Sequence, residues 1–572
     1  MCASRSYDPV PCYPCVGGDL SAGWATLCAR LPPGGRVLAV DGPQILDWDT
    51  VIAAIAGQLR QHGTEVVVLD VREHMAPWDL LVKRTASAEL LADDPDFATI
   101  PSCALADFFD ELPGPPHAPA WLTLVAGPGA ALVAHDELWY ADLPKRYAEA
   151  AVTRGEGRNL GQPADSGPPT TRRLFYIDWP LLDRHRESIA DSIDCWIDTR
   201  DADNPRWLAG PTLRATLLAM STRPFRTRPT FNTTSWGGHW GQRQLGFNAE
   251  APNTALGYEL IAPESGLLLG PAPEQAVEVP FQLLVGLHPA AVLGDEVQAR
   301  FGSSFPIRFD YLDTVGGGNL SVHCHPQPEY MRAVFGWSYT QQETYYVMVS
   351  EPGNLIYLGL RGDADLGEFE RRAHDAVDHS VAFDIEEFVQ TFPADPHQLF
   401  LIPDGTPHGS GVGNVVLEVS ATPYLYSLRF YDWLRRDGEG TFRPVHPGHA
   451  FSNLNRHRRG TQVRRDLVQQ ARLLDRGHGW RTELLGSLPE MFYDVQRLVL
   501  DAQATAPQDT GGRFHVLNLV EGDMVTIRTP DDAAGWREHA LAYAETLVVP
   551  AAVGHYEVTA ASSARLVRAA VR

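Results

Sequence analysis

The pattern of hydrophobic residues changes near residue 225, and this change limits the folds open to the chain. Residues 36–222 alternate apolar runs typical of strands with segments of helical spacing, which favours a parallel sheet covered by helices. From about residue 231 onward, short β-branched and aromatic runs are separated by Gly, Pro and Asp, which favours antiparallel barrels or jelly rolls. We therefore predict a multidomain chain that is α/β at first and mainly β afterwards.

The apolar runs of the α/β region predict individual elements. Strands are expected at 36–41, 65–70, 121–127 and 173–178, and helices at 50–62 and about 180–198. Residues 222–230 contain Pro224 and Pro229, cannot continue the preceding helix and are expected to form a linker. The expected parts are a poorly defined segment at 1–35, an α/β domain at 36–222, a β domain with a helical insertion near 367–378 at 223–480, and a smaller barrel at 481–572.

The composition of the 572-residue chain excludes several classes of partner. Because 71 Asp and Glu outnumber 47 Lys and Arg, the formal net charge is −24 and the surface repels phosphate backbones and anionic lipid headgroups. The longest uncharged apolar stretch, 120–134, is shorter than the roughly 20 residues of a spanning helix. The first ten residues do not resemble a signal peptide, and seven cysteines do not form a disulfide framework. We expect a cytoplasmic protein with no nucleic-acid or membrane partner.

Three histidines and one glutamate carry the strongest chemical signal. His323 and His325 are two residues apart, so in a strand both imidazoles face the same side. Glu343 begins an apolar strand, where an unpaired charge is costly unless a metal ion compensates it. His408 ends a PxGxxH turn at 403–408. We expect these four side chains to converge on one divalent ion, with zinc as the expected metal; the alternative is a cluster of structural histidines.

These motifs resemble the metal motifs of cupins, and in particular those of the class I mannose-6-phosphate isomerases of the short bacterial type. The segment 319–331 is similar to the LSVQVHP segment of that family, with His323 where the family usually has a glutamine ligand. The resemblance covers roughly 231–572 and implies a double cupin, in which a metal-binding jelly roll precedes a metal-free one. Further matching segments are the WGG turn at 236–238, a glycine–glutamate pair at 257–259, an LE stretch at 417–418 and an RxYDxxR segment at 429–435.

The resemblance also implies roles for residues around the metal. Arg429 would stabilise the oxyanion of an enediolate, and Glu259 would act as the base or as an orienting group. The alternatives are that Arg429 forms a surface ion pair with Asp432 and that Glu259 is a solvated carboxylate at a strand edge. The residues expected to bind substrate are Trp236, Gly237, Gly238 and Asp432.

Two lysines of the family are missing from this chain. Asp310 stands where the family has a lysine in its FPLLVKxLD strand, and Gln341 stands where its GKTE segment has the other. A phosphate dianion needs cationic or amide donors, and an aspartate repels it. Arg308 would share a face with Asp310 in a regular strand, where it either compensates for the lost lysine or is neutralised by Asp310. The metal chemistry is therefore expected to carry over better than phosphate recognition.

The first domain resembles the uridine kinase type of P-loop fold in segments 37–50, 93–96 and 107–112. The phosphate-binding loop of such a fold needs GxxxxGK[ST], because backbone amides and a lysine hold the phosphates. Here only Gly42 matches, and the loop has no lysine. We expect a kinase-like domain that does not bind ATP.

The function expected from these patterns is that of a metal-dependent aldose–ketose isomerase, converting mannose 6-phosphate to fructose 6-phosphate. Its cofactor would be Zn²⁺ or another divalent ion, and its partner a small sugar or sugar phosphate. The N-terminal domain would be a structural or regulatory appendage, and a homodimer is one option for the assembly. The alternatives are a non-catalytic carbohydrate-binding or regulatory cupin protein, and an isomerase of a different, unphosphorylated sugar.

Overall fold

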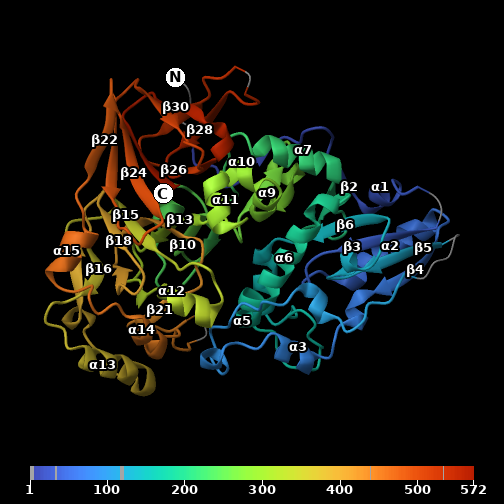
Figure 1. The fold of residues 1–572 in the computed structure, drawn as a ribbon, viewed down its shortest axis with the longest axis horizontal. Helices are drawn as coiled ribbons and strands as arrows, with labels where there is room; N and C mark the ends of the chain where they lie inside the picture. Colours follow the sequence, from blue (N-terminus) through green and yellow to red (C-terminus); the bar gives the residue numbers. More distant parts are fainter. Residues whose placement is uncertain (1–5, 33–34, 116–120, 438–439, 533) are drawn as a thin grey trace.

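The computed structural model describes residues 6–32, 35–115, 121–437, 440–532 and 534–572. An α/β region formed by the first third of the chain lies beside two stacked β-sheet regions, a central one in yellow and a C-terminal one in red (Figure 1). The helices α6 (Trp179–Ile189) and α9 (Phe281–Leu287) contact each other between these regions. Across these described ranges, no helix combines the length and the apolar character needed to cross a membrane.

The α/β region is built on a seven-stranded sheet with the order β2-β8-β7-β6-β3-β5-β4. The five strands from β7 to β4 in this order run parallel, and β8 pairs antiparallel with β7. Both faces are buried, since Leu38 and Val40 belong to one hydrophobic cluster and Val37 and Ala39 to another. The strands are β2 (Ser21–Ala22), β3 (Arg36–Asp41), β4 (Glu65–Asp70), β5 (Trp121–Ala126), β6 (Glu137–Asp142), β7 (Cys195–Asp198) and β8 (Arg206–Ala209).

Helices connect these strands, and most of the predicted elements of this region are present. The expected strands at 36–41, 65–70 and 121–127 are confirmed, and α2 (Trp48–Gln61) confirms the helix expected at 50–62. Asp47 caps α2 by accepting a hydrogen bond from the Thr50 N–H. The other helices are α1 (Trp24–Cys28), α3 (Trp78–Arg84), α4 (Lys145–Thr153) and α7 (Gly210–Met220).

The prediction for residues 173–198 is wrong in two respects. Leu174–Asp178 form a π-helical turn between α5 (Thr171–Arg173) and α6, not a strand. A short apolar run fits a strand and a buried helix equally, and Pro180 occupies the first turn of α6, where its missing N–H costs nothing. The helix then ends at Ile189, and Cys195–Asp198 form β7, an inner strand of the sheet between β8 and β6.

A few residues of the N-terminal segment and most of the expected linker pack against the rest of the chain. β1 (Cys12–Tyr13) pairs in parallel with β11 (Gly266–Leu269), which also pairs with β12 (Val277–Pro280). The backbone N–H of Arg226 donates to the Tyr13 hydroxyl at 2.6 Å, and the Arg226 side chain is 1% exposed. Residues 1–5 and 33–34 of the segment expected at 1–35 lie outside the described residues. Most of residues 224–230 are thus buried.

The central region consists of two antiparallel sheets, with the orders β18-β15-β20-β13-β10-β9 and β17-β16-β19-β14-β21. The expected helical insertion is confirmed as α13 (Leu366–His379), which buries Phe369, Ala373 and Ala376 and lies at the periphery (Figure 1). The strands are β9 (Thr230–Asn232), β10 (Leu256–Leu260), β13 (Ile307–Asp313), β14 (Val322–Cys324), β15 (Glu343–Val349), β16 (Leu355–Leu360), β17 (Val389–Pro393), β18 (Leu399–Ile402), β19 (His408–Ser410), β20 (Val415–Ala421) and β21 (Leu428–Tyr431).

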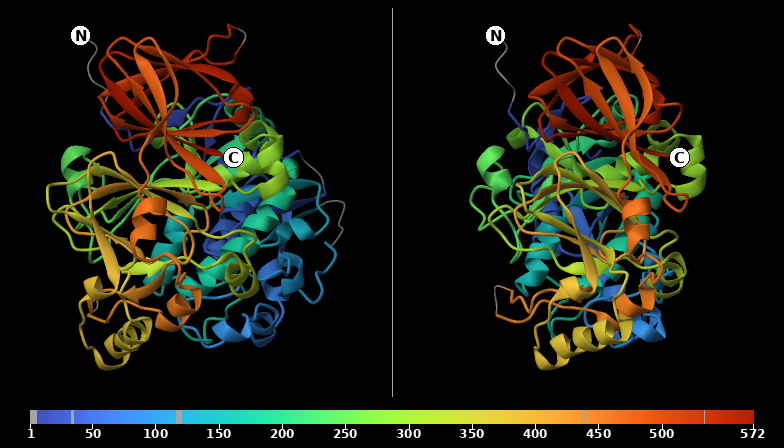
Figure 2. Two further views of the ribbon diagram at one scale, coloured as in Figure 1. Left: turned by 60° about the vertical axis from the view of Figure 1, so that its left-hand side comes forward. Right: turned by 90° about the vertical axis from the view of Figure 1, so that its left-hand side faces the viewer.

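The last region is also antiparallel and stands above the central one (Figure 2). Its two sheets have the orders β22-β23-β24-β31-β26-β29 and β25-β30-β27-β28. Its first strand begins at Arg472, before the boundary expected at 481. The strands are β22 (Arg472–Gly477), β23 (Trp480–Gly486), β24 (Tyr493–Leu500), β25 (Thr505–Asp509), β26 (His515–Glu521), β27 (Met524–Arg528), β28 (Glu538–Ala542), β29 (Thr546–Val549), β30 (His555–Ala560) and β31 (Ala564–Val571). Short helices in the two β regions are α8 (Trp240–Gln244), α10 (Pro289–Leu293), α11 (Asp295–Phe301), α12 (Pro328–Tyr330), α14 (Pro447–Asn453) and α15 (Thr461–Leu467).

Candidate metal centre

The structure brings His323, His325, Glu343 and His408 together in the interior of the central region. One ligand atom from each residue lies within 4.8 Å of the others, and all four side chains are buried. Strand register explains the convergence, because His323 on β14 lies directly opposite His408 on β19, and paired residues project to the same face. Glu343 enters from the first residue of β15 in the other sheet.

Each histidine is oriented by a hydrogen bond at Nδ1. The Nδ1 atoms lie 2.9, 3.2 and 2.8 Å from the carbonyl oxygens of Ser321, Tyr426 and Thr406, respectively, so Nδ1–H donates and Nε2 is left to face the cluster. Outer hydrogen bonds of this kind fix the tautomer of metal-binding histidines. Three imidazole nitrogens and one carboxylate are a donor set suited to zinc and similar divalent ions. The residues present therefore fit a metal ion.

The charge states of the cluster match those of metal ligands. Burial lowers the pKa of His323 and His325, so both imidazoles are neutral near pH 7. Burial by itself would raise the pKa of Glu343, but His408 and His325 outweigh it and hold that pKa well below the usual range. The Glu343 carboxylate contacts Nε2 of His325 and lies 3.2 Å from Nε2 of His408. Metal binding needs an ionised carboxylate and an unprotonated nitrogen on each imidazole, and burial favours the second condition at His323 and His325.

A cavity of about 210 Å³ opens beside the cluster, and the structure places two of the predicted site residues in its wall. Trp236 and Arg429 line this cavity together with His323 and Glu343. Arg429 lies opposite His323 in the pairing of β14 with β21, so its side chain shares the face of the metal ligands. Its Nη1 donates to the Pro444 carbonyl at 3.0 Å. Burial, reinforced by Arg443, lowers the pKa of Arg429 to about 10, so it remains a cation at neutral pH.

Asp432 and the two glycines of the WGG turn have structural contacts instead. Asp432 is buried and accepts hydrogen bonds from Arg435 and Arg443, each at 2.8 Å, so the alternative of an Arg429–Asp432 surface pair is not the observed arrangement. A Cβ atom at Gly237 or Gly238 would lie 2.0 or 2.2 Å from a neighbouring side-chain oxygen. These positions need glycine because the turn packs tightly, and only Trp236 of the turn reaches the cavity.

Glu259 does not lie beside the metal cluster. Its neighbour Tyr258 lines the cavity, and because successive strand residues face opposite ways, Glu259 points away from it. The Glu259 carboxylate accepts hydrogen bonds from the Tyr7 hydroxyl and, at 2.9 Å, from the Thr546 N–H, and it lies 3.8 Å from Arg226. Burial raises the pKa of Glu259 to about 6, with Arg226 opposing the shift. Its surroundings are those of a structural charge cluster.

The positions of the missing lysines are occupied by a compact charge network. Arg308 binds Glu418 and lies 3.4 Å from Asp310, so Arg308 is neutralised by two carboxylates. Gln341 and Asp310 both line the cavity. The sequence analysis assigned no role to Glu418 or to Tyr258; the alternation of side chains along β10 would have indicated Tyr258.

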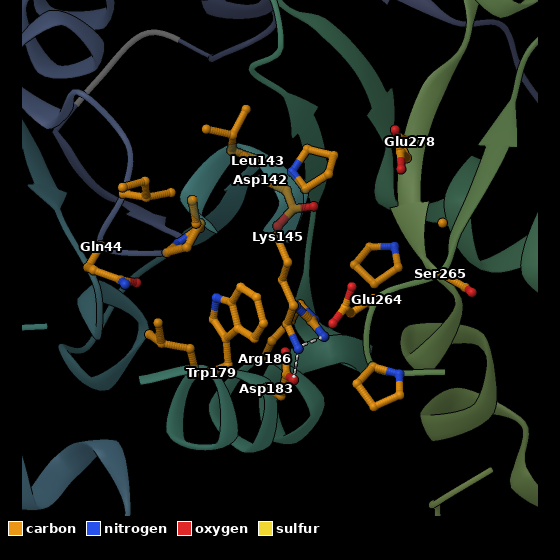
Figure 3. A pocket seen from close by; sticks show the side chains of 18 of the residues that line it. Gln44, Asp142, Leu143, Lys145, Trp179, Asp183, Arg186, Glu264, Ser265 and Glu278 are labelled. Carbon is orange, nitrogen blue, oxygen red and sulfur yellow. Dashed lines mark hydrogen bonds and ion pairs between the residues drawn. The ribbon is translucent and has the colours of Figure 1, made fainter. Parts of the chain in front are cut away.

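The carboxyl end of β3 holds one of the chain's own carboxylates where a P-loop would hold phosphate. Asp41 accepts hydrogen bonds from the N–H groups of Gly42 and Ala131 at 2.7 and 2.8 Å, and it lies 2.9 Å from His185 Nε2. The adjacent cavity measures about 40 Å³, room for little more than water (Figure 3). The carboxylates that line it are Asp142, Asp183, Glu264 and Glu278. The kinase-like character of the domain and its expected lack of ATP binding both stay predictions.

Two parts of the chain are similar to known proteins. A family described as a domain of unknown function (DUF8485) matches residues 23–222. Mannose-6-phosphate isomerase ManA of Bacillus subtilis is 24% identical over 231 residues, which are 40% of this chain and 66% of that protein. Mannose-6-phosphate isomerase of Streptococcus mutans is 25% identical over 218 residues, 37% of this chain and 61% of that protein. The matches thus span slightly less than two thirds of these curated relatives.

This chain is also similar to solved structures of proteins named mannose 6-phosphate isomerase or phosphomannose isomerase. Mannose 6-phosphate isomerase from Bacillus subtilis has a TM-score of 0.47 at 16% identity, covering 61% of this chain and 99% of that one. A mutant of phosphomannose isomerase from Salmonella typhimurium has a TM-score of 0.47 at 14% identity, covering 61% and 100%.

Proposed function

We propose that the chain is a metal-dependent aldose–ketose isomerase. The observation that carries this proposal is the buried set of three histidines and one glutamate beside a polar cavity that also holds Arg429. Within this class, the reaction we propose is the interconversion of mannose 6-phosphate and fructose 6-phosphate. The names of two distant sequence relatives support that choice.

The residues around the cavity suit a proton transfer between adjacent carbons. His323, His325, Glu343 and His408 would hold the ion, which when bound polarises a carbonyl group. As the carbon acid loses its proton, negative charge develops on the neighbouring oxygen. The Arg429 guanidinium, on the same face as the ligands, stabilises that charge.

The cavity offers Asp310 as the base, in the role expected of Glu259. Asp310 lines the cavity from β13, and neither of its carboxylate oxygens accepts a hydrogen bond from the described residues. Burial raises the pKa of Asp310 above its usual range, toward the value that suits a base near neutral pH. Arg308, 3.4 Å away, holds the carboxylate in place.

Asp310→Asn tests this role with a side chain of nearly the same size. We expect kcat to fall by about 10²–10⁴, the contribution of a general base, with metal content unchanged. The matched control is Asp313→Asn on the same strand, because Asp313 accepts backbone hydrogen bonds from Gly241 and Val315 and does not line the cavity. The control should change the melting temperature and spare kcat. A normal kcat in Asp310→Asn would contradict the assignment.

A substrate panel tests the function itself. The full chain is assayed with mannose 6-phosphate, fructose 6-phosphate, mannose and fructose before and after chelation. We expect the phosphorylated pair to interconvert, the chelator to stop the reaction and added Zn²⁺ to restore it. Binding without turnover would favour the non-catalytic alternative, and turnover of mannose alone would keep the class of reaction and change the substrate.

A further inference from the structure

The metal cavity continues into an outer cavity that is walled by both the central region and the N-terminal α/β domain. The outer cavity measures about 360 Å³. Together the two cavities reach the size range of small-molecule sites. The residues that line both are Leu256, Tyr258, Tyr424, Ser427 and Arg429.

The α/β domain supplies the far wall of this outer cavity. Its contributions come from the loop at 95–97 and from the helical segment at 171–176, which the sequence analysis had expected to form partly a strand. Arg172 on α5 is the cation among them. The metal cavity itself is not lined by Arg172, so this guanidinium lies at the outer end of the combined space.

The junction between the two domains is held by specific contacts, so the outer wall is part of the folded chain. His449 Nε2 lies 2.8 Å from the Asp94 carboxylate, and the Tyr176 hydroxyl donates to the Leu425 carbonyl at 2.9 Å. The Phe97 ring packs against the His446 ring with centroids 4.6 Å apart. The segment that carries Arg172 is thereby fixed relative to the metal cluster.

Among the described residues, no carboxylate lies at hydrogen-bond distance from one cation of the outer cavity, Arg172. Arg172 donates from Nε to the Phe97 carbonyl at 2.7 Å and from Nη2 to the Leu91 carbonyl at 2.9 Å, both neutral acceptors. Asp96, the carboxylate of this cavity, lies 3.3 Å from His446. Arg172 and Arg429 are both partly buried, and burial removes part of the solvation of each guanidinium group and lowers its pKa. A bound anion would replace that solvation.

We propose that Arg172 binds the anionic group of the substrate, so that the N-terminal domain determines the specificity of the metal site. The inference rests on the proposed function for the identity of the ligand, a sugar phosphate whose reacting carbons face the metal cluster. It also accounts for the loss of the two family lysines, since the cation for phosphate would come from the added domain. The domain is then part of the substrate site and not an appendage.

Two substitutions separate the charge of Arg172 from its hydrogen bonds. Arg172→Gln removes the charge and keeps an amide donor for the carbonyls, whereas Arg172→Lys keeps the charge. The matched control is Arg184→Gln, because Arg184 on α6 also donates to two carbonyls, those of Pro101 and Cys103, but does not line the outer cavity. Each full-length, metal-loaded protein is titrated with mannose 6-phosphate, inorganic phosphate and mannose by calorimetry, and its melting temperature is recorded.

We expect Arg172→Gln to raise the Kd of mannose 6-phosphate and phosphate at least about tenfold without changing the Kd of mannose, as loss of a charge-assisted hydrogen bond should. Arg172→Lys should retain most of the affinity, and Arg184→Gln all of it. Unchanged affinity in Arg172→Gln, equal weakening for mannose, or no phosphate binding in the unmodified chain would overturn the inference. Because binding needs no turnover, an inactive chain with Arg172-dependent phosphate affinity would refute the proposed function alone. If the chain is an isomerase and its KM is unchanged in Arg172→Gln, only this inference is refuted.

Discussion

The orientation of single side chains determines which residues of the candidate site act together. The three histidines share one arrangement, in which Nδ1 donates to a backbone carbonyl and Nε2 faces Glu343 and its neighbours. Arg429 joins them because it lies opposite His323 in the sheet. The Nε atom of Arg429 is buried and forms no hydrogen bond with the described residues, so its N–H can donate to a ligand.

Substitution of Arg429 tests its part in the reaction. Arg429→Ala should lower kcat by about 10²–10³, because a group that stabilises the developing oxyanion is lost, while the metal content stays the same. Arg435→Ala is the control, since Arg435 pairs with Asp432 at 2.8 Å but does not line the metal cavity. Turnover, metal stoichiometry and melting temperature are measured for both variants. Normal turnover in Arg429→Ala would show that Arg429 does not stabilise the oxyanion.

The sequence predicted that the four candidate ligands converge, but it did not predict which carboxylate faces the cavity. Two histidines separated by one residue face the same side of any strand, so the shared face of His323 and His325 could be predicted without knowing the fold. For Glu259 the face depends on the phase of β10, and that phase places Tyr258 in the cavity. The groups around Glu259 come from distant parts of the sequence, since Arg226 lies in the segment expected to be a linker and Tyr7 lies near the N-terminus.

At the scale of elements, the segment 222–230, which was expected to be a linker, connects distant parts of the chain through the contacts of Arg226. Arg226 donates to Glu545 at 2.6 Å and to the Asp8 carbonyl at 2.8 Å, and it lies 3.8 Å from Glu259. These partners come from three separate parts of the chain. Composition could not reveal this, because the basic residues and prolines of the segment are typical of exposed connections.

Loss of the Arg226 charge should destabilise the whole fold. Arg226→Met leaves the buried carboxylates of Glu259 and Glu545 without their cation, and we expect the free energy of unfolding to fall by about 3–5 kcal/mol. Arg371→Met is the control, because Arg371 pairs with Glu368 and Asp375 on the exposed face of α13, where the loss of such pairs should leave stability almost unchanged. Urea unfolding of both variants measures the difference. Equal stabilities would show that the buried cluster contributes nothing.

Other elements could be predicted from the sequence where the pattern of apolar residues fitted only one type of secondary structure. Strands β3 and β4 lie between turn residues and a long amphipathic helix, and both were predicted within their observed bounds. Residues 174–178 have an equally apolar pattern but fold as a π-helical turn, because tertiary packing against Tyr426 and its neighbours decides between strand and helix.

At the scale of the molecule, the α/β domain and the central region share one continuous space beside the metal cluster. The outer cavity takes its wall from both, and Arg172 and Arg429 come from opposite sides of the junction. The small cavity after β3 is a separate space, lined by the α/β domain together with residues from 263–280 (Figure 3). The domain thus supplies one wall of the outer cavity at its junction with the β region.

The central claim is that the four-residue cluster holds the ion on which isomerisation depends. The direct test is a titration of Zn²⁺ into the metal-free full chain while conversion of mannose 6-phosphate is recorded. Our account predicts that activity rises in proportion to bound metal and saturates at one ion per chain, and that His408→Ala neither binds the ion nor gains activity. Full activity without metal, or one bound ion with no turnover of any sugar phosphate, would contradict it.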